Sequence, residues 1–518
     1  MSLARDITTV SSGTLMSRLL GFARDSWIAA LLGSGPFAEA FFAVLQLINF
    51  FRRLLADGSL NSAFVPIWLA TRNGKNGATN ANRFTKRSLL TIGCITGIVA
   101  LLVIVFAPLV AVVLAPGFDA GRQELVSFYL RLVAPYIVLA GLVAVIAAAL
   151  NAETRVVAVT ISTVVFNLVI LLALAFVIDQ PHQFVTSTWL AVAIVVAGLT
   201  QLLITGVTWL ATGKRLSHER MRVPDRTRQF FARALPGLIA TGIPQLKLIA
   251  GAAIASSSAA GVSWLYYANR LYELPLGIAS IAIAAVIMPR IAASLRSGDT
   301  DSFVQTQSRA FEIALGLALP AAAGFALLAM PIAGGLFEHG AFGPSDTVAV
   351  AAALTAICAG LPGHVLEKLF GAVSFAQGDT STPMIAALSG LAAAIAGSVL
   401  LFPHYGHVGV AAAIAISGWV GAVLLGLILY GRGWLRLDRH AVHRLPRIVL
   451  ATLVMSGALA YGLTLGHTLW PALASAALDR VILLTVLVAL GIAIYLAALQ
   501  ILGVAKLKDL VAVIRCRT

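Results

Sequence analysis

The sequence predicts an all-α, polytopic membrane protein. Of its 518 residues, 59% are hydrophobic and 11% are charged, and the mean hydropathy is +0.94. A soluble protein of this length needs far more charge to cover its surface. The apolar residues form solid runs such as LLVIVFAPLVAVVLAP (101–116), and about 20 apolar residues cross a bilayer as a helix. A β-barrel would instead show short alternating segments.

Fourteen apolar segments are expected to be transmembrane helices, as two sets of six and a final pair. In order they are 7–31, 37–70, 84–115, 124–150, 156–178, 185–212, 229–256, 262–289, 310–332, 346–371, 382–402, 408–431, 448–466 and 481–503. The second is too long for a straight crossing, so we expect Asp57-Gly58-Ser59 to bend or break it. The stretch PHYGH (403–407) is expected to be a hairpin loop between the eleventh and twelfth helices.

The two sets of six predict two pseudo-symmetric lobes, since parallel halves around a central site are a common transporter design. We expect an N-terminal lobe at 1–228, a C-terminal lobe at 229–447, and the last two helices with a cytoplasmic tail at 448–518. Most Lys and Arg residues lie in alternate connections, and the opposite connections hold only Arg122 and Arg480. By the positive-inside rule, both termini are cytoplasmic.

The formal net charge of +15 is therefore mainly a feature of topology. A basic run, KRLSHERMRVPDRTR (214–228), is interpreted as a cytoplasmic loop facing anionic lipid rather than as a nucleic-acid site. The three cysteines lie far apart, so neither a disulfide framework nor a metal site is predicted. There is also no Walker loop, HExxH motif or acidic metal-binding cluster. We predict no cofactor, no metal and no enzymatic activity.

Several charged residues inside the predicted spans are not explained by topology. Each costs about 2.5–3.5 kcal/mol at the centre of a span, so such residues usually face a cavity or a partner. The basic ones are Arg18, Arg24, Arg52, Arg53, Arg131, Lys247, Arg270 and Lys368, and the main acidic ones are Asp25, Glu39, Asp57, Glu273 and Glu367. Because guanidinium groups match phosphate oxygens, this net cationic set predicts an anionic ligand with more than one phosphate.

Structural explanations compete for some of these charges. Arg270 and Glu273 are three residues apart on one helical face and could neutralise each other. Arg131 lies near a helix start and is expected to snorkel to the interface. Arg18 and Asp25 share a face, so Asp25 is expected to steady Arg18. Arg24 points away from that face unless the helix is kinked near Gly21.

Three stretches carry a resemblance to a known family. SSGTLMSRLLGFARD (11–25), EAFFAVLQLINFFRRLLADGSLNSAFVP (39–66) and GVSWLYYANRLYELPLG (261–277) resemble the MurJ (MviN) lipid II flippases of the multidrug/oligosaccharidyl-lipid/polysaccharide exporter (MOP) superfamily. The resemblance runs from residue 1 to about residue 505 and includes LAPGF (114–118). It implies two six-helix lobes around a cationic cavity, and a groove for a lipid tail at the last two helices.

The resemblance also implies a function in peptidoglycan synthesis at the bacterial cytoplasmic (inner) membrane. The expected substrate is lipid II, the undecaprenyl-pyrophosphate-linked MurNAc-pentapeptide-GlcNAc precursor, moved to the periplasmic leaflet by alternating access. Membrane lipids and other cell-wall synthesis proteins are the expected partners. No nucleic-acid partner is expected. The alternative is a flippase for another polyprenyl-pyrophosphate glycan, such as an O-antigen or capsule unit, and the RxxGFxRD motif disfavours it.

By matched motif positions, the resemblance implies five residues for substrate binding and transport. These are Arg18, Arg24, Arg52, Arg270 and Glu39, the last where most relatives have Asp. From their positions in the sequence we add five supporting cavity residues, Asp25, Asn49, Arg53, Glu273 and Lys368. No sodium site is evident, because the seventh segment offers Gln245 and Lys247 but no acid, and Asp379 is expected in a loop.

Overall fold

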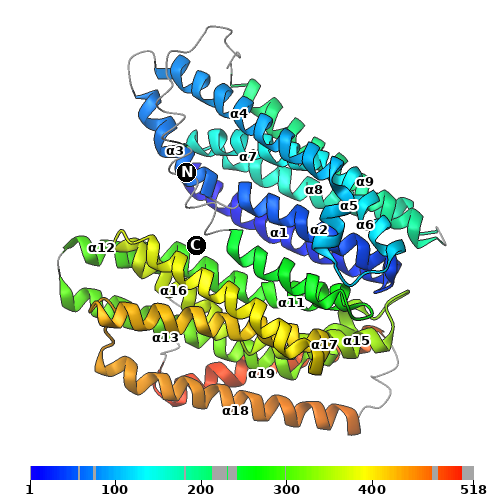
Figure 1. Cartoon of the computed structure of the whole chain (residues 1–518). Coiled ribbons are helices and arrows are strands. Elements are labelled where there is room, and N and C mark those ends of the chain that lie inside the picture. Colours follow the sequence, from blue (N-terminus) through cyan, green and yellow to red (C-terminus); the bar gives the residue numbers. More distant parts are fainter. Residues whose placement is uncertain are drawn as a thin grey trace. The chain divides into compact units, whose positions relative to one another are not determined.

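The computed structural model describes residues 2–56, 59–73, 77–179, 182–212, 230, 242–297, 299–469 and 477–504. These residues are almost entirely helical and contain no strand, which confirms the all-α fold (Figure 1). Among them, eight helices are long and apolar enough to cross a membrane, or nine if one bent pair counts as a single span. The number of fourteen spans and the cytoplasmic termini stay predictions.

The chain forms two compact units, and the first comprises Met1–Ser263 with His339–Phe342. The short segment belongs to unit 1 because it packs on the end of the first helix, where the Ala341 amide donates to the Ala30 carbonyl at 2.7 Å. The helices of unit 1 are α1 (Ser2–Leu32), α2 (Pro36–Ala56), α3 (Ser59–Arg72), α4 (Gly77–Val105), α5 (Ala107–Leu114), α6 (Ala120–Val133), α7 (Pro135–Ala152), α8 (Val156–Phe176), α9 (Gln183–Leu210) and Gly242–Ala255.

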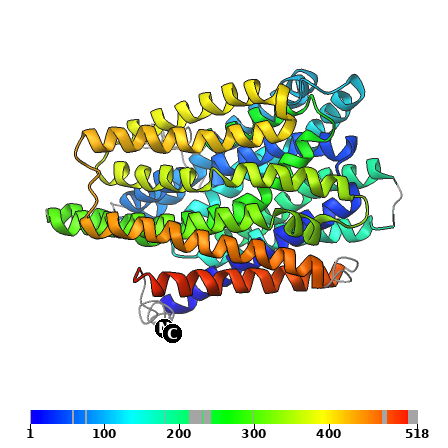
Figure 2. The ribbon, with the colours of Figure 1, turned by 90° about the horizontal axis from the view of Figure 1, so that it is seen from below.

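Unit 2 comprises Trp264–Glu338 and Gly343–Thr518. Its first helix, α11 (Gly261–Ala282), begins in the last residues of unit 1 and continues into a π-helical turn, η1 (Ile283–Ile287). The others are α12 (Met288–Ser297), α13 (Thr300–Leu327), α14 (Ala329–Phe337), α15 (Pro344–Cys358), α16 (Leu361–Ala376), α17 (Ser381–Gly431), α18 (Arg439–Leu469) and α19 (Ala477–Ile501). Figure 2 shows α18 and α19 side by side. The predicted lobe boundaries after residues 228 and 447 stay predictions.

Proline and glycine divide several predicted segments. The third and fourth become the pairs α4–α5 and α6–α7, each second helix having a proline in its first turn, where the missing N–H costs nothing. The second is divided between α2 and α3, and the predicted break at Asp57-Gly58 lies outside the described residues. The seventh is described at Phe230 and from Gly242 on, where it forms the helix Gly242–Ala255.

The predicted hairpin at 403–407 is confirmed. Gly406, at φ 56° and ψ −138°, interrupts α17, and this conformation is accessible essentially only to glycine. A Cβ built on Gly397 would lie 3.0 Å from the Cβ of Ala413, so the chain folds back on itself at this point. The two arms of α17 correspond to the eleventh and twelfth predicted segments.

The helices of unit 2 approach closely where α16 meets α17. A Cβ on Gly360 would lie 2.4 Å from the Cα of Ala415, and one on Gly363 would lie 2.8 Å from the amide nitrogen of Trp419. In a membrane, where helix association depends on van der Waals packing, small residues at such crossings let the backbones touch. The Trp419 indole also donates to the Ala359 carbonyl at 2.9 Å.

We therefore predict that Gly360→Ala destabilises the protein. The new methyl group would collide with backbone atoms, which have no room to move, and we expect a loss of about 1–3 kcal/mol. Thermal unfolding of the detergent-solubilised chain measures the effect. Gly457→Ala is the control, because nothing lies within 4 Å of its Cβ position and alanine favours a helix. Equal melting temperatures for the two variants would contradict the packing described here.

Candidate functional site

A pocket of about 390 Å³, its mouth included, lies among α1, α2, α7, α8 and α9 of unit 1. Its walls are mostly apolar, and three polar side chains face it, Arg24, Asn49 and Arg52. Its apolar lining residues are Ile28, Phe41, Leu45, Ile48, Tyr136, Phe166, Ile170, Leu190 and Ile194. A largely apolar cavity with a few convergent polar groups is the usual form of a ligand site.

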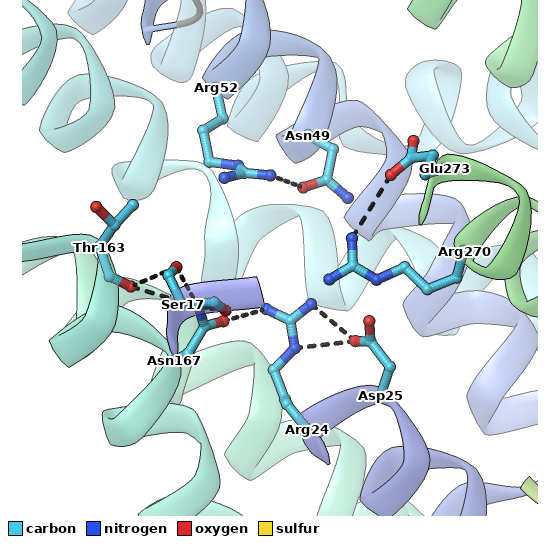
Figure 3. A network of polar contacts seen from close by, with 9 residues as sticks. All are labelled: Ser17, Arg24, Asp25, Asn49, Arg52, Thr163, Asn167, Arg270 and Glu273. Carbon is cyan, nitrogen blue, oxygen red and sulfur yellow. Dashed lines mark hydrogen bonds and ion pairs between the residues drawn. The ribbon is translucent and has the colours of Figure 1, made fainter. Parts of the chain in front are cut away.

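Arg24 is held in a fixed orientation by two partners (Figure 3). Its Nε and one terminal nitrogen donate to Asp25 Oδ1 at 2.9 and 2.7 Å, and its other terminal nitrogen donates to Asn167 Oδ1 at 3.2 Å. Asp25 is fully buried and the Arg24 side chain is 12% exposed. A guanidinium has five N–H donors, so within the described structure two of them remain for a ligand.

Arg52 supplies the excess positive charge of the pocket. It lies one turn after Asn49 on α2, and its terminal nitrogen donates to Asn49 Oδ1 at 3.4 Å (Figure 3). Among the residues that the structure describes, Arg52 has no carboxylate partner. Asp25 offsets the charge of Arg24, so the pocket keeps one net positive charge from Arg52. Arg53, the next residue, is partly exposed and does not line the pocket.

Asn167 is a site residue that the sequence analysis missed. Its amide nitrogen donates to the carbonyl and hydroxyl of Ser17 at 3.1 and 3.2 Å and to the Thr163 carbonyl at 3.3 Å. These bonds join α8 to α1 and aim the Asn167 oxygen at Arg24. The available signal was a single amide within the apolar run VVAVTISTVVFNLVILLALAF (156–176), since polar side chains inside spans usually bond to a neighbouring helix.

The expected roles of Arg18 and Asp25 are wrong in one respect. Asp25 pairs with Arg24, and within the described part of the chain Arg18 makes no ion pair and its side chain is exposed. Helix α1 also runs unbroken from Ser2 to Leu32, so Arg24 reaches the pocket without a break in the helix at Gly21. A carboxylate next to a guanidinium in sequence reaches it because the arginine side chain is long enough to fold back. The role of Arg18 in transport stays a prediction.

Glu39 does not line the pocket but caps a helix. Its carboxylate accepts from the Val262 and Ser263 amides at 2.9 and 3.2 Å, at the N-terminus of α11, and pairs with Arg122 at 3.2 Å. The side chain is 1% exposed. An anion is stabilised at a helix N-terminus by the free N–H groups and the helix dipole. The bond from Arg122 to Asp119, in the loop after α5, lowers the pKa of Asp119.

In unit 2, Arg270 and Glu273 form the ion pair that their spacing allowed. Their charged atoms are 3.6 Å apart (Figure 3). Asn269 donates to the same carboxylate at 3.2 Å. The pair is partly exposed, so neutralisation is consistent with the geometry. Lys368 on α16 is exposed. The proposed transport roles of Arg270, Glu273 and Lys368 stay predictions.

No metal site is found among the described residues, where no three His, Cys, Asp or Glu side chains lie close enough to hold an ion. Asp379 lies in the predicted loop, between α16 and α17. It accepts from the amides of Ser381 and Thr382, the Thr382 hydroxyl and Arg432. The hydroxyl bond is the main reason that the pKa of Asp379 falls to about 2. Its carboxylate is therefore engaged in capping α17.

We predict that Glu39→Ala lowers the stability of the protein by about 1–3 kcal/mol, because two helix amides and Arg122 lose a buried acceptor. Glu39→Asp keeps the charge on a shorter arm and is expected to recover most of the loss. Thermal unfolding in detergent gives the ranking. Glu124→Ala, at an exposed position of α6, is the control and should stay within about 0.5 kcal/mol of the parent. Equal stability of Glu39→Ala and the parent would contradict the cap.

Known structures share the fold of this chain. A solved "Lipid II flippase MurJ, inward closed conformation" superimposes with a TM-score of 0.78 at 21% identity, covering 97% of this chain and 99% of that one. An inward-facing multidrug resistance transporter of the MATE family, in the MOP superfamily, gives a TM-score of 0.64 at 16% identity over 83% of this chain and 97% of that one. At these identities the likeness establishes the fold.

Sequence comparisons place the chain more narrowly. A "Probable lipid II flippase MurJ" of Rhizobium meliloti (strain 1021) is 36% identical over 98% of this chain and 95% of its own length. One of Rhizobium tropici is 33% identical over 97% and 95%. The family model described as "Lipid II flippase MurJ" matches residues 28–478. A match over most of the chain and two such relatives show that the chain belongs to the MurJ family of lipid II flippases.

Proposed function

We propose that this multi-pass protein of the bacterial inner membrane carries lipid II from the cytoplasmic to the periplasmic leaflet by alternating access. The observation that supports this most is the unit 1 pocket, where Arg24 and Arg52 offer N–H donors between apolar walls. The protein belongs to a family of transporters. We propose that it changes no covalent bond of the substrate.

The pocket chemistry suits a pyrophosphate. Each phosphate offers several oxygens to the planar fork of a guanidinium. Arg24 is already oriented by Asp25 and Asn167, so little side-chain entropy is lost when it binds. Arg52 contributes the unneutralised charge. Because the apolar walls exclude water, these bonds offset part of the hydration that the headgroup loses on entering the membrane.

The rest of the substrate needs an apolar path and further contacts. We propose that the undecaprenyl tail stays in the lipid along α18 and α19, which lie side by side and expose large apolar residues such as Leu453 and Ile492. Arg18 and Arg270 are proposed as further contacts to the pyrophosphate or the peptide carboxylates. Glu39 is proposed to act indirectly, by holding the start of α11.

The function is tested by depleting the protein in its host and restoring it from a plasmid. Depletion is expected to remove lipid II from the outer face of the inner membrane, measured by its accessibility to an external probe, and to stop cross-linking of new wall. Normal exposure of lipid II in depleted cells that contain no other flippase would refute the proposal. Loss of an O-antigen or capsule unit, with normal lipid II exposure, would indicate the alternative substrate.

For the pocket, we predict that Arg24→Ala and Arg52→Ala each lower lipid II translocation at least about tenfold. A charge-assisted hydrogen bond contributes about 1.5–3 kcal/mol, which corresponds to a factor of ten or more. Translocation in proteoliposomes measures the change. Arg131→Ala is the matched control, because Arg131 is exposed on α6 and does not line the pocket. Parent-like rates for both pocket variants would rule out this binding site.

Asn167 is predicted to act through Arg24. Asn167→Ala removes one acceptor of Arg24 and the tie to Ser17, so we expect a smaller loss of translocation than in Arg24→Ala. The double variant should be no slower than Arg24→Ala alone, since residues that act as a unit are not additive. The measurement is the translocation rate in proteoliposomes of the parent, Arg24→Ala, Asn167→Ala and the double variant. Fully additive losses would mean that Asn167 has a separate role.

A further inference from the structure

We propose that Tyr272 and His364 form a proton-binding site inside unit 2, and that gain or loss of a proton there changes how α11 is held. The two residues belong to neither the unit 1 pocket nor the ion pairs described above. The inference goes beyond the transport of lipid II, since its ligand is a proton.

The geometry of the pair is close and shielded. Tyr272 Oη on α11 lies 2.8 Å from His364 Nδ1 on α16, and the same Nδ1 lies 3.1 Å from the Gly360 carbonyl oxygen. Tyr272 is 3% exposed and His364 is partly buried. The imidazole rests on the backbone of α17, where a Cβ on Gly418 would lie 2.5 Å from Nδ1. Glycine at this position therefore makes the room that the ring occupies.

Nδ1 has one position for a hydrogen and two neighbouring oxygens. When Nδ1 carries no proton, it accepts a bond from the Tyr272 hydroxyl, and its lone pair also faces the Gly360 carbonyl. When the ring gains a proton at Nδ1, this atom becomes a donor with one hydrogen, which bonds either to the Gly360 carbonyl or to the Tyr272 oxygen, so Nδ1 can no longer accept from the Tyr272 hydroxyl. A proton on Nδ1 therefore either breaks or reverses the bond between α11 and α16. Imidazole is the side chain that exchanges protons near neutral pH.

Acidic groups lie close to the pair. Glu367 is one turn along α16 from His364 and rests on α17, where a Cβ on Gly421 would lie 2.7 Å from the carboxyl carbon. Glu273 follows Tyr272 directly on α11, and the buried Cys358 is the last residue of α15.

Among the side chains that the structure describes on the adjoining elements, the remaining charged groups are at a surface or paired. The helices packed against α16 are α12, α13, η1 and α17. Lys368 on α16, Arg290 on α12 and Arg309 on α13 are exposed, and Glu312 on α13 is paired with Arg444 at 3.2 Å.

The position of Tyr272 on α11 gives the proton a mechanical consequence. Tyr272 lies between Arg270 and Glu273, and Pro275 follows three residues later. Pro275 has no N–H for the carbonyl one turn before it, and the π-helical turn η1 comes after α11. Such irregular turns are the places where a helix bends. The bond to His364 therefore fixes α11 just before Pro275 and η1, where its hydrogen bonding is irregular.

The test measures the protonation of His364 directly. The full chain, labelled with ¹⁵N-histidine and placed in lipid nanodiscs, is studied by solid-state NMR, because imidazole nitrogen shifts distinguish the neutral tautomers from the cation. Signals lost in His364→Gln identify His364. We expect its signals to change from cation to neutral between about pH 5 and about pH 8. His364 signals fixed in one state over that range would overturn the proposal.

Two further variants separate a proton site from a merely structural bond. Tyr272→Phe keeps the ring and removes the hydroxyl, and it is expected to move the midpoint for His364 by roughly half a pH unit or more. An unmoved midpoint would overturn the link to α11. His404→Gln, at an exposed position of the α17 hairpin, is the control and should leave the His364 titration unchanged. No lipid II is present, so the result does not depend on the proposed transport.

Discussion

The largely enclosed guanidinium of Arg24 is the group on which the candidate site depends. A charge with so little exposure is tolerated in an apolar protein only if its donors are bonded. Asp25 supplies the counter-charge and accepts two bonds, Asn167 accepts the third, and Asn167 is itself fixed by Ser17 and Thr163. The pocket therefore has a rigid positive edge before any ligand arrives.

The need of a buried charge for bonded partners also explains the position of Glu39 in unit 1. Glu39 is almost completely buried, and it is stabilised by the free amides at the start of α11 and by Arg122. The acid is thus used to fix a helix end, while the pocket two residues further along α2 keeps its excess positive charge at Arg52. Glu39 and Arg52 lie at opposite ends of α2, so the negative charge that caps α11 does not neutralise the positive charge of the pocket.

In unit 2, glycines set the close approach of α16 and α17. Gly360 and Gly363 bring α16 against the backbone of α17, while Gly418 and Gly421 leave space for the polar side chains of His364 and Glu367. Polar groups between tightly packed helices have few alternative partners, so the bond from Tyr272 to His364 is specific. A change of protonation there has to be accommodated by the hydrogen bonds, because the packed backbones have no room to move.

The sequence by itself determined the all-α fold, the membrane location, the hairpin at 403–407 and the presence of arginines within spans, where a charge needs a partner or a cavity. These features follow from local composition, because a run of about twenty apolar residues forms a membrane-spanning helix and a short polar stretch between two such runs forms a turn. Only the tertiary structure decided which partner each charge takes: Arg24 with Asp25 and Asn167, and Glu39 with the amides of α11. Residues that bond across helices are far apart in sequence, and helical periodicity gives a face but not the neighbour that the face meets.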